Sequence, residues 1–98
     1  MLIVRLNTEQ ITDWASFHLV CKEAFDFPDY YGENMNAWID CMSDLVIGEK
    51  TVQIEITNTE NFKSRQSEIF DALVECSAFV NNRFMESAEI SKIAIIFL

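Results

Sequence analysis

The 98-residue chain is long enough for one domain, and half of its residues are apolar, so it can bury a core of its own. Sixteen acidic residues against seven basic ones give a net charge of −9, which repels nucleic acid and anionic membranes and attracts basic proteins. With two glycines and one proline, the chain has no Gly-rich phosphate loop, and its longest apolar run is too short to cross a bilayer. We therefore expect a single domain over residues 1–98 that binds neither nucleic acid nor membrane.

The first half of the chain predicts a strand followed by two helices. Residues 2–6 form a short apolar run typical of a strand, and Thr12 is the expected cap of a helix that ends at Pro28. A second helix is expected from an Asn34 cap to a stop at Gly48. Apolar residues recur at spacings of three and four in both helices: Trp14, Phe17, Cys21 and Phe25 in the first, and Met35, Trp38, Ile39, Met42 and Val46 in the second.

The second half predicts a strand, a helix and a final strand. Residues 51–57 alternate strictly between apolar and polar, which favours a strand at the edge of a sheet with one wet face. Residues 58–64 form a polar connection with a short helical turn around Phe62, and Ser67 is the expected cap of the next helix. Residues 93–98 are apolar without a break, typical of a strand in the middle of a parallel sheet. The helix expected after Ser67 has an inner face that consists of Ile69, Leu73, Cys76 and Val80.

This order of elements favours a compact α/β layer with helices over the sheet. The three cysteines are odd in number and show no CxxC spacing, so we expect reduced thiols in or near the core, no metal site and no cofactor. Reduced thiols, and an N-terminus without a basic region ahead of its apolar residues, predict a cytoplasmic protein.

An acidic segment stands out in the middle of the chain. Residues 23–49 contain seven acids and no lysine or arginine to neutralise them. Asn36, Asp40 and Asp44 recur every four positions, so they share one face of the second helix, opposite its apolar face. Residues 28–34 form a turn that places two tyrosines beside the helix start, and we expect a positive φ at Gly32.

Charge pattern alone leaves two interpretations of this segment open. In the first, the acids form a solvated helix face, and Tyr30 and Tyr31 are partly buried packing residues. In the second, the segment is a protein-binding face directed at a cationic pocket. Tyrosines are enriched at such interfaces, and carboxylates paired with Arg or Lys give specificity and fast association.

The stretch PDYYGENMNAWIDCM, residues 28–42, closely resembles the signature of the barstar family, the intracellular inhibitors of barnase-type ribonucleases. The resemblance implies a small three-stranded parallel sheet flanked by helices. It also implies that an acidic helix and the adjacent tyrosine turn block the cationic active site of a ribonuclease, with one-to-one stoichiometry and a monomeric free protein. Family members also occur as immunity proteins against a cell's own secreted nuclease toxin.

Site residues follow from this resemblance position by position. Tyr30 matches the tyrosine placed against the ribonuclease, and Asp40 matches the aspartate that enters its active site. Asn36 stands where barstar itself has a second aspartate, and Ile39 where it has an interfacial tryptophan, which leaves barnase or a different nuclease as the target. Glu68, near the start of the later helix, is expected to add a further acid across a groove from the second helix. The full expected partner-binding set is Tyr30, Tyr31, Gly32, Glu33, Asn34, Asn36, Ile39, Asp40, Asp44 and Glu68.

Two other classes of protein compete with an inhibitor as the interpretation of this sequence. Asp40 and Asp44 lie one helical turn apart, as acid–base pairs can, but this is also the spacing of any solvated helix face. His18 is the only histidine, and Cys41 has no histidine nearby in the sequence, so we expect no enzyme and no catalytic residue. A barstar-like module that docks a basic partner without inhibiting a nuclease remains the alternative.

Overall fold

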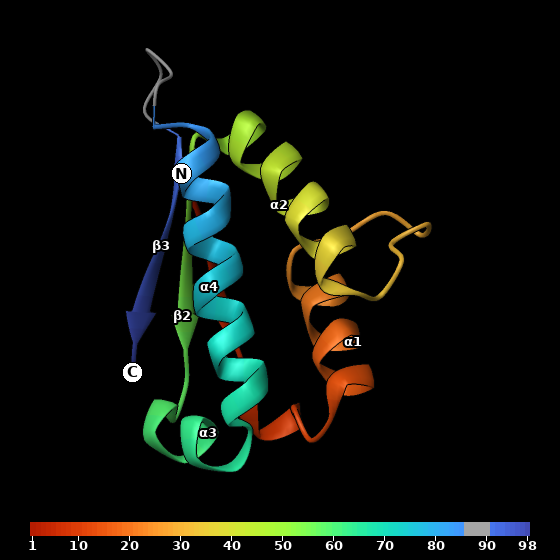
Figure 1. Ribbon diagram of the computed structural model, residues 1–98, viewed down its shortest axis with the longest axis vertical. Coiled ribbons are helices and arrows are strands. Elements are labelled where there is room, and N and C mark those ends of the chain that lie inside the picture. Colours follow the sequence, from red (N-terminus) through yellow and green to blue (C-terminus); the bar gives the residue numbers. More distant parts are fainter. Residues whose placement is uncertain (86–90) are drawn as a thin grey trace.

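A three-stranded parallel sheet with helices against one of its faces forms the fold of the computed structural model, which describes residues 1–85 and 91–98. The strands are β1 (Leu2–Leu6), β2 (Thr51–Ile56) and β3 (Lys92–Phe97). The four helices are α1 (Trp14–Ala24), α2 (Met35–Glu49), α3 (Thr59–Arg65) and α4 (Ser67–Arg83), and a 3-10 turn covers Thr8–Gln10. Figure 1 shows α1, α2 and α4 on the same side of the sheet, with α3 at one end. The α/β class expected from the sequence is confirmed.

The order of the strands differs from the expected one. The sheet runs β1-β2-β3, so β2 is the central strand and β3 lies at an edge. The expected edge position of residues 51–57 and the expected central position of residues 93–98 are therefore both wrong. The physical reason is that helices cover one face only, so even the central strand alternates: Ile54 is fully buried, while Gln53 and Glu55 on the other face are partly exposed.

Two expected helix caps are displaced by one residue. Asp13, rather than Thr12, caps α1: its Oδ1 accepts from the Ser16 amide at 2.8 Å, and the Ser16 hydroxyl accepts from the Asp13 amide at 3.0 Å. Ser67 is the first residue of α4, and the residue before it, Gln66, makes no capping bond with its side chain. The helical turn expected around Phe62 is confirmed, and it extends over the whole of α3.

Helix α2 begins as expected and ends later. Asn34 is its N-cap, with its Oδ1 accepting from the Ala37 amide at 2.8 Å. Gly48 does not stop the helix, which continues to Glu49 and closes at Lys50, where φ is 70°. The outer face of α2 is thus presented on an unbroken 15-residue helix.

The core lies between the helices and the sheet, and most of the predicted apolar positions point into it. Trp38 is fully buried and is the largest side chain there. Trp14 and Cys76, which were expected on inner faces, are instead exposed and half-buried, respectively.

All three cysteines are free. Burial raises the pKa of the Cys21 thiol to about 12, and this effect outweighs the opposite effect of its contact with Trp38. Among the described residues, no helix is long and apolar enough to span a membrane, and no cluster of side chains is suited to a metal ion.

Candidate functional site

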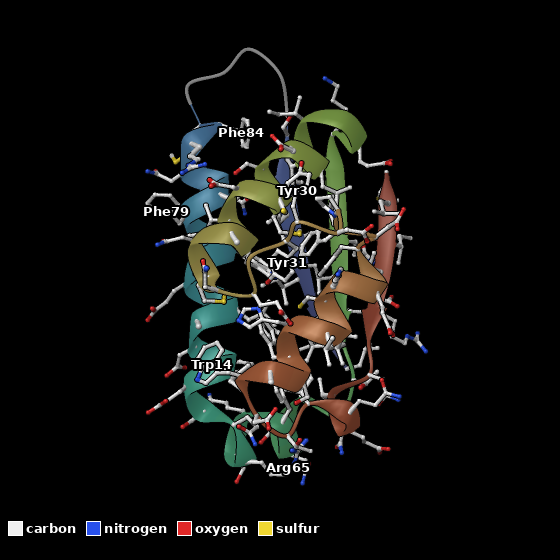
Figure 2. All side chains as sticks on the ribbon, turned by 90° about the vertical axis from the view of Figure 1, so that its right-hand side faces the viewer. Trp14, Tyr30, Tyr31, Arg65, Phe79 and Phe84 are labelled. Carbon is white, nitrogen blue, oxygen red and sulfur yellow. The ribbon has the colours of Figure 1, made fainter. Side chains whose placement is uncertain are left out.

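Tyr30 and Tyr31 occupy a tight turn that leads into α2, and their side chains leave it in opposite directions. The Tyr31 amide donates to the Pro28 carbonyl at 2.9 Å, which closes the turn. Tyr30 is 84% exposed, whereas Tyr31 is only 5% exposed. Figure 2 shows Tyr30 above Tyr31, on the face that α2 crosses. Tyr30 is therefore available to a partner.

Tyr31 fastens the turn to α1 from inside. Its hydroxyl lies 2.5 Å from Nδ1 of His18, and its ring packs against Phe27 with centroids 4.8 Å apart. Burial raises the pKa of the Tyr31 hydroxyl well above its usual value, so the hydroxyl keeps its proton and shares one hydrogen bond with Nδ1 of His18. Burial also lowers the pKa of His18, against an opposing effect of the Glu33 carboxylate. Tyr31 belongs to the expected partner-binding set, and the structure places it beneath the turn, where its side chain contacts α1.

Gly32, Glu33 and Asn34 shape the start of α2. The positive φ expected at Gly32 is wrong, because Glu33 adopts it, with φ 53°. A Cβ at Gly32 would lie 3.3 Å from Asn34 Nδ2 and 3.4 Å from Ala37 Cβ, so a larger residue there would press the capping side chain of Asn34 by a few tenths of an ångström. The Asn34 side chain also donates to the Gly32 carbonyl at 3.2 Å, so it joins turn and helix. Glu33 itself is exposed.

The outer face of α2 brings the acidic residues together with Tyr30. Asn36, Asp40 and Asp44 are all exposed, as their spacing predicts. Ile39 is half-buried and packs against the core. A surface pocket of about 420 Å³, which we call the acidic pocket, lies between the turn and α2. It is lined by Phe25, Asp26, Phe27, Pro28, Tyr30, Asp40, Cys41, Asp44 and Leu45.

A cation from α4 lies beside this acidic face, which the sequence did not indicate. Arg83 Nη1 is 3.8 Å from Asp40 Oδ1 and donates to the Ser43 hydroxyl at 3.2 Å. The guanidinium also lies over the ring of Phe79, 5.0 Å from its centroid. The acids of residues 23–49 are therefore not free of a neutralising cation, because the fold brings one in from a distant part of the chain.

Glu68 does not join the acidic pocket. It lies in the first turn of α4, while Arg83 is that helix's last residue, about 22 Å away at 1.5 Å of rise per residue. Glu68 lines a separate pocket with Asp13 and Trp14. Trp14 in turn lines a third pocket with Glu33, so this tryptophan lies between Glu68 and the start of α2.

The site thus consists of exposed carboxylates and a tyrosine on a rigid support, a surface suited to binding cationic groups. A comparison with known families agrees with this geometry: the family model described as Barstar (barnase inhibitor) matches residues 1–95. The chain belongs to the barstar family. The match includes β1, β2, all four helices, the acidic pocket and the first four residues of β3. Barstar family proteins are inhibitors rather than enzymes, and membership supports binding to a ribonuclease.

Proposed function

We propose that this barstar-family protein inhibits a basic ribonuclease by placing Asp40, on the outer face of α2, into the cationic active site. The observation that carries the proposal is the position of Asp40. Its side chain is 76% exposed, and it lines the acidic pocket with Tyr30 and Asp44. It is the sixth of the 15 residues of α2, so turns of the helix on both sides of it can contact a concave partner.

The inhibition works by imitation of a phosphate. A ribonuclease binds the RNA backbone with Arg, Lys or His side chains, and a carboxylate can accept hydrogen bonds from the same donors. Because α2 is a regular helix with a packed inner face, Asp40 is already in place before binding, and little conformational entropy is lost on docking. Asp44 lines the same acidic pocket, Asn36 lies one turn before Asp40 on α2, and Glu33 lies at the start of the helix beside Trp14; all three are exposed polar groups that extend the contact.

Tyr30 supplies contact area beside the carboxylates. A tyrosine has a large, rigid side chain, so it buries much surface at a small entropic cost. The turn that carries it is held by the hydrogen bond between Tyr31 and His18 and by the two bonds of the Asn34 side chain. Tyr31, Gly32 and Asn34 thus act as supporting residues, Ile39 contributes its exposed part, and Glu68 contacts the partner only if that partner reaches past Trp14.

The complex in this proposal has one inhibitor for each ribonuclease, and the free protein is a monomer in the cytoplasm. The role is that of an immunity protein when the ribonuclease is a toxin made by the same cell. The alternative of docking without inhibition makes a different prediction, since a partner would be bound with its active site still open.

The test measures RNA cleavage by barnase and by further barnase-family ribonucleases in the presence of increasing amounts of the protein. The proposal predicts that the activity of at least one of them falls to the background level at a one-to-one ratio. A complex that forms and still cleaves RNA would support the alternative. Full activity with no complex for every ribonuclease would contradict the proposed function.

A further inference from the structure

The binding face extends beyond α2 onto α4, and this inference rests on the proposed function. We infer that Arg83, supported by Phe79, is a specificity-determining residue that binds a carboxylate of the ribonuclease beside the basic group that Asp40 binds. The surface would then recognise a pair of opposite charges on its partner, not positive charge alone.

Arg83 is held in place by groups other than Asp40. Its Nη1 donates to the Ser43 hydroxyl at 3.2 Å, and its guanidinium rests on the Phe79 ring at 5.0 Å. The separation of 3.8 Å between Nη1 and the Asp40 carboxylate is longer than a hydrogen bond. Nη1 and the Asp40 oxygen thus form an exposed ion pair without a hydrogen bond, and the hydrogen bond that positions Arg83 is the one to Ser43.

Within the described part of the chain, the side chains around Arg83 are exposed to a partner. Phe79 is 51% exposed, and the side chains of Arg83 and Asp40 are 43% and 76% exposed. Figure 2 shows α2 between the turn with Tyr30 and the helix with Phe79, and all three face the viewer. A partner centred on Asp40 consequently reaches Tyr30 on one side and α4 on the other.

The chemistry of the guanidinium defines what it binds. An arginine offers five N–H donors in a planar fork, which matches a carboxylate better than any other protein group. A partner with cations alone would bring one of them close to Arg83, and this repulsion would weaken the complex. A ribonuclease that carries a carboxylate next to its basic residues satisfies both Asp40 and Arg83.

Arg83 could instead do no more than neutralise Asp40. That role predicts the opposite effect of removing Arg83 on the affinity for the ribonuclease. Removal of a neutralising cation would free Asp40 and tighten the complex, whereas removal of a contact would weaken it. The conservative variant Arg83→Lys keeps the charge and loses the fork, so a carboxylate contact predicts an intermediate loss.

The experiment measures inhibition constants for Arg83→Gln, Arg83→Lys and Phe79→Ala against the ribonuclease, barnase or a family member, that the parent inhibits. Arg5→Gln is the matched control, because Arg5 lies on the opposite face of the sheet, paired with Glu55. We expect Arg83→Gln to weaken inhibition about tenfold or more, as the loss of a charged hydrogen bond does, and Phe79→Ala to act in the same direction. Arg5→Gln should match the parent, and thermal melts establish that each variant is folded.

Arg83→Gln in an Asp40→Asn background separates a contact between Arg83 and the ribonuclease from neutralisation of Asp40 by Arg83. A loss that persists there supports a direct contact between Arg83 and the ribonuclease. The inference is overturned if Arg83→Gln inhibits as well as or better than the parent, or if its effect disappears in the Asp40→Asn background. Failure of the parent to inhibit any of the ribonucleases is a different result, since it overturns the proposed function and this inference with it.

Discussion

Tyr30 and Tyr31 are neighbours in the chain, yet one is 84% exposed and the other is 5% exposed with its hydroxyl on Nδ1 of His18. The turn therefore has an outer tyrosine for a partner and an inner tyrosine that ties it to α1. Because both come from one dipeptide, the exposed ring depends for its position on the buried one. This separation leads to the first prediction.

Substitutions at the two tyrosines should affect different properties. Tyr30→Ala should leave the free energy of unfolding within about 0.5 kcal/mol of the parent and cost about 2 kcal/mol of binding, as an interface anchor does. Tyr31→Phe removes the partner of the buried His18 nitrogen and should cost about 1–3 kcal/mol of stability. Denaturant unfolding and calorimetric titration of both variants test this, and a Tyr30→Ala variant that unfolds early would contradict the assignment.

Stability should fall as the pH drops below the ordinary pKa of histidine, 6.5, because burial lowers the pKa of His18 in the folded protein. The unfolded chain then takes up a proton that the folded protein resists, so this contribution is complete above pH 6.5 and is lost as the pH falls through the folded pKa. The non-titrating variant His18→Gln is the control. The difference in unfolding free energy between parent and variant should shrink on acidification, and a constant or growing difference would refute this role of His18.

The two tryptophans provide a matched pair for the core. Trp38 is fully buried beneath the outer face of α2, whereas Trp14 is 38% exposed. Trp38→Ala should destabilise the protein by about 3–5 kcal/mol, a large part of the total for a domain of this size. Trp14→Ala should cost clearly less in thermal melts, and equal losses would mean that the core is not centred on α2.

Association with the ribonuclease should slow steeply as salt rises. The seven acids of residues 23–49 create a field that steers a cationic partner, and salt screens this field over about 8 Å at physiological ionic strength. Stopped-flow association rates at several salt concentrations measure the effect. A flat dependence would remove electrostatic steering from the account without removing the interface.

Much of the fold could be predicted from the sequence because apolar spacing reports local structure directly. The faces of α1 and α2 and the Asn34 cap follow from residues three or four positions apart. Strand order could not be predicted in the same way. Alternation in β2 shows that one sheet face is wet, but an edge strand and a central strand in a sheet covered on one side produce the same pattern.

The candidate site was predictable where one helix supplies it and unpredictable where two elements meet. Asp40 and Asp44 share a face because they are one turn apart, and the fold leaves that face exposed. Tyr31 and Tyr30 could not be told apart, since the inward ring is set by contacts with His18 and Phe27 that no local pattern reports. Arg83 reaches Asp40 through the packing of α4 beside α2, and no local pattern reports such a contact.

The central claim, that Asp40 is the residue inserted into the ribonuclease, is tested most directly by calorimetric titration of Asp40→Ala and Asp44→Ala against the inhibited ribonuclease. Both residues are exposed, so both variants should melt like the parent. Asp40→Ala should lose about 2–5 kcal/mol of binding, because the basic groups of the partner are left buried and unpaired. Asp44→Ala, one turn further along α2, should lose only about 0–1 kcal/mol, as a solvated charge pair at the rim of an interface does. Parent-like binding by Asp40→Ala would contradict the account and identify the acidic face of α2 as a solvated surface.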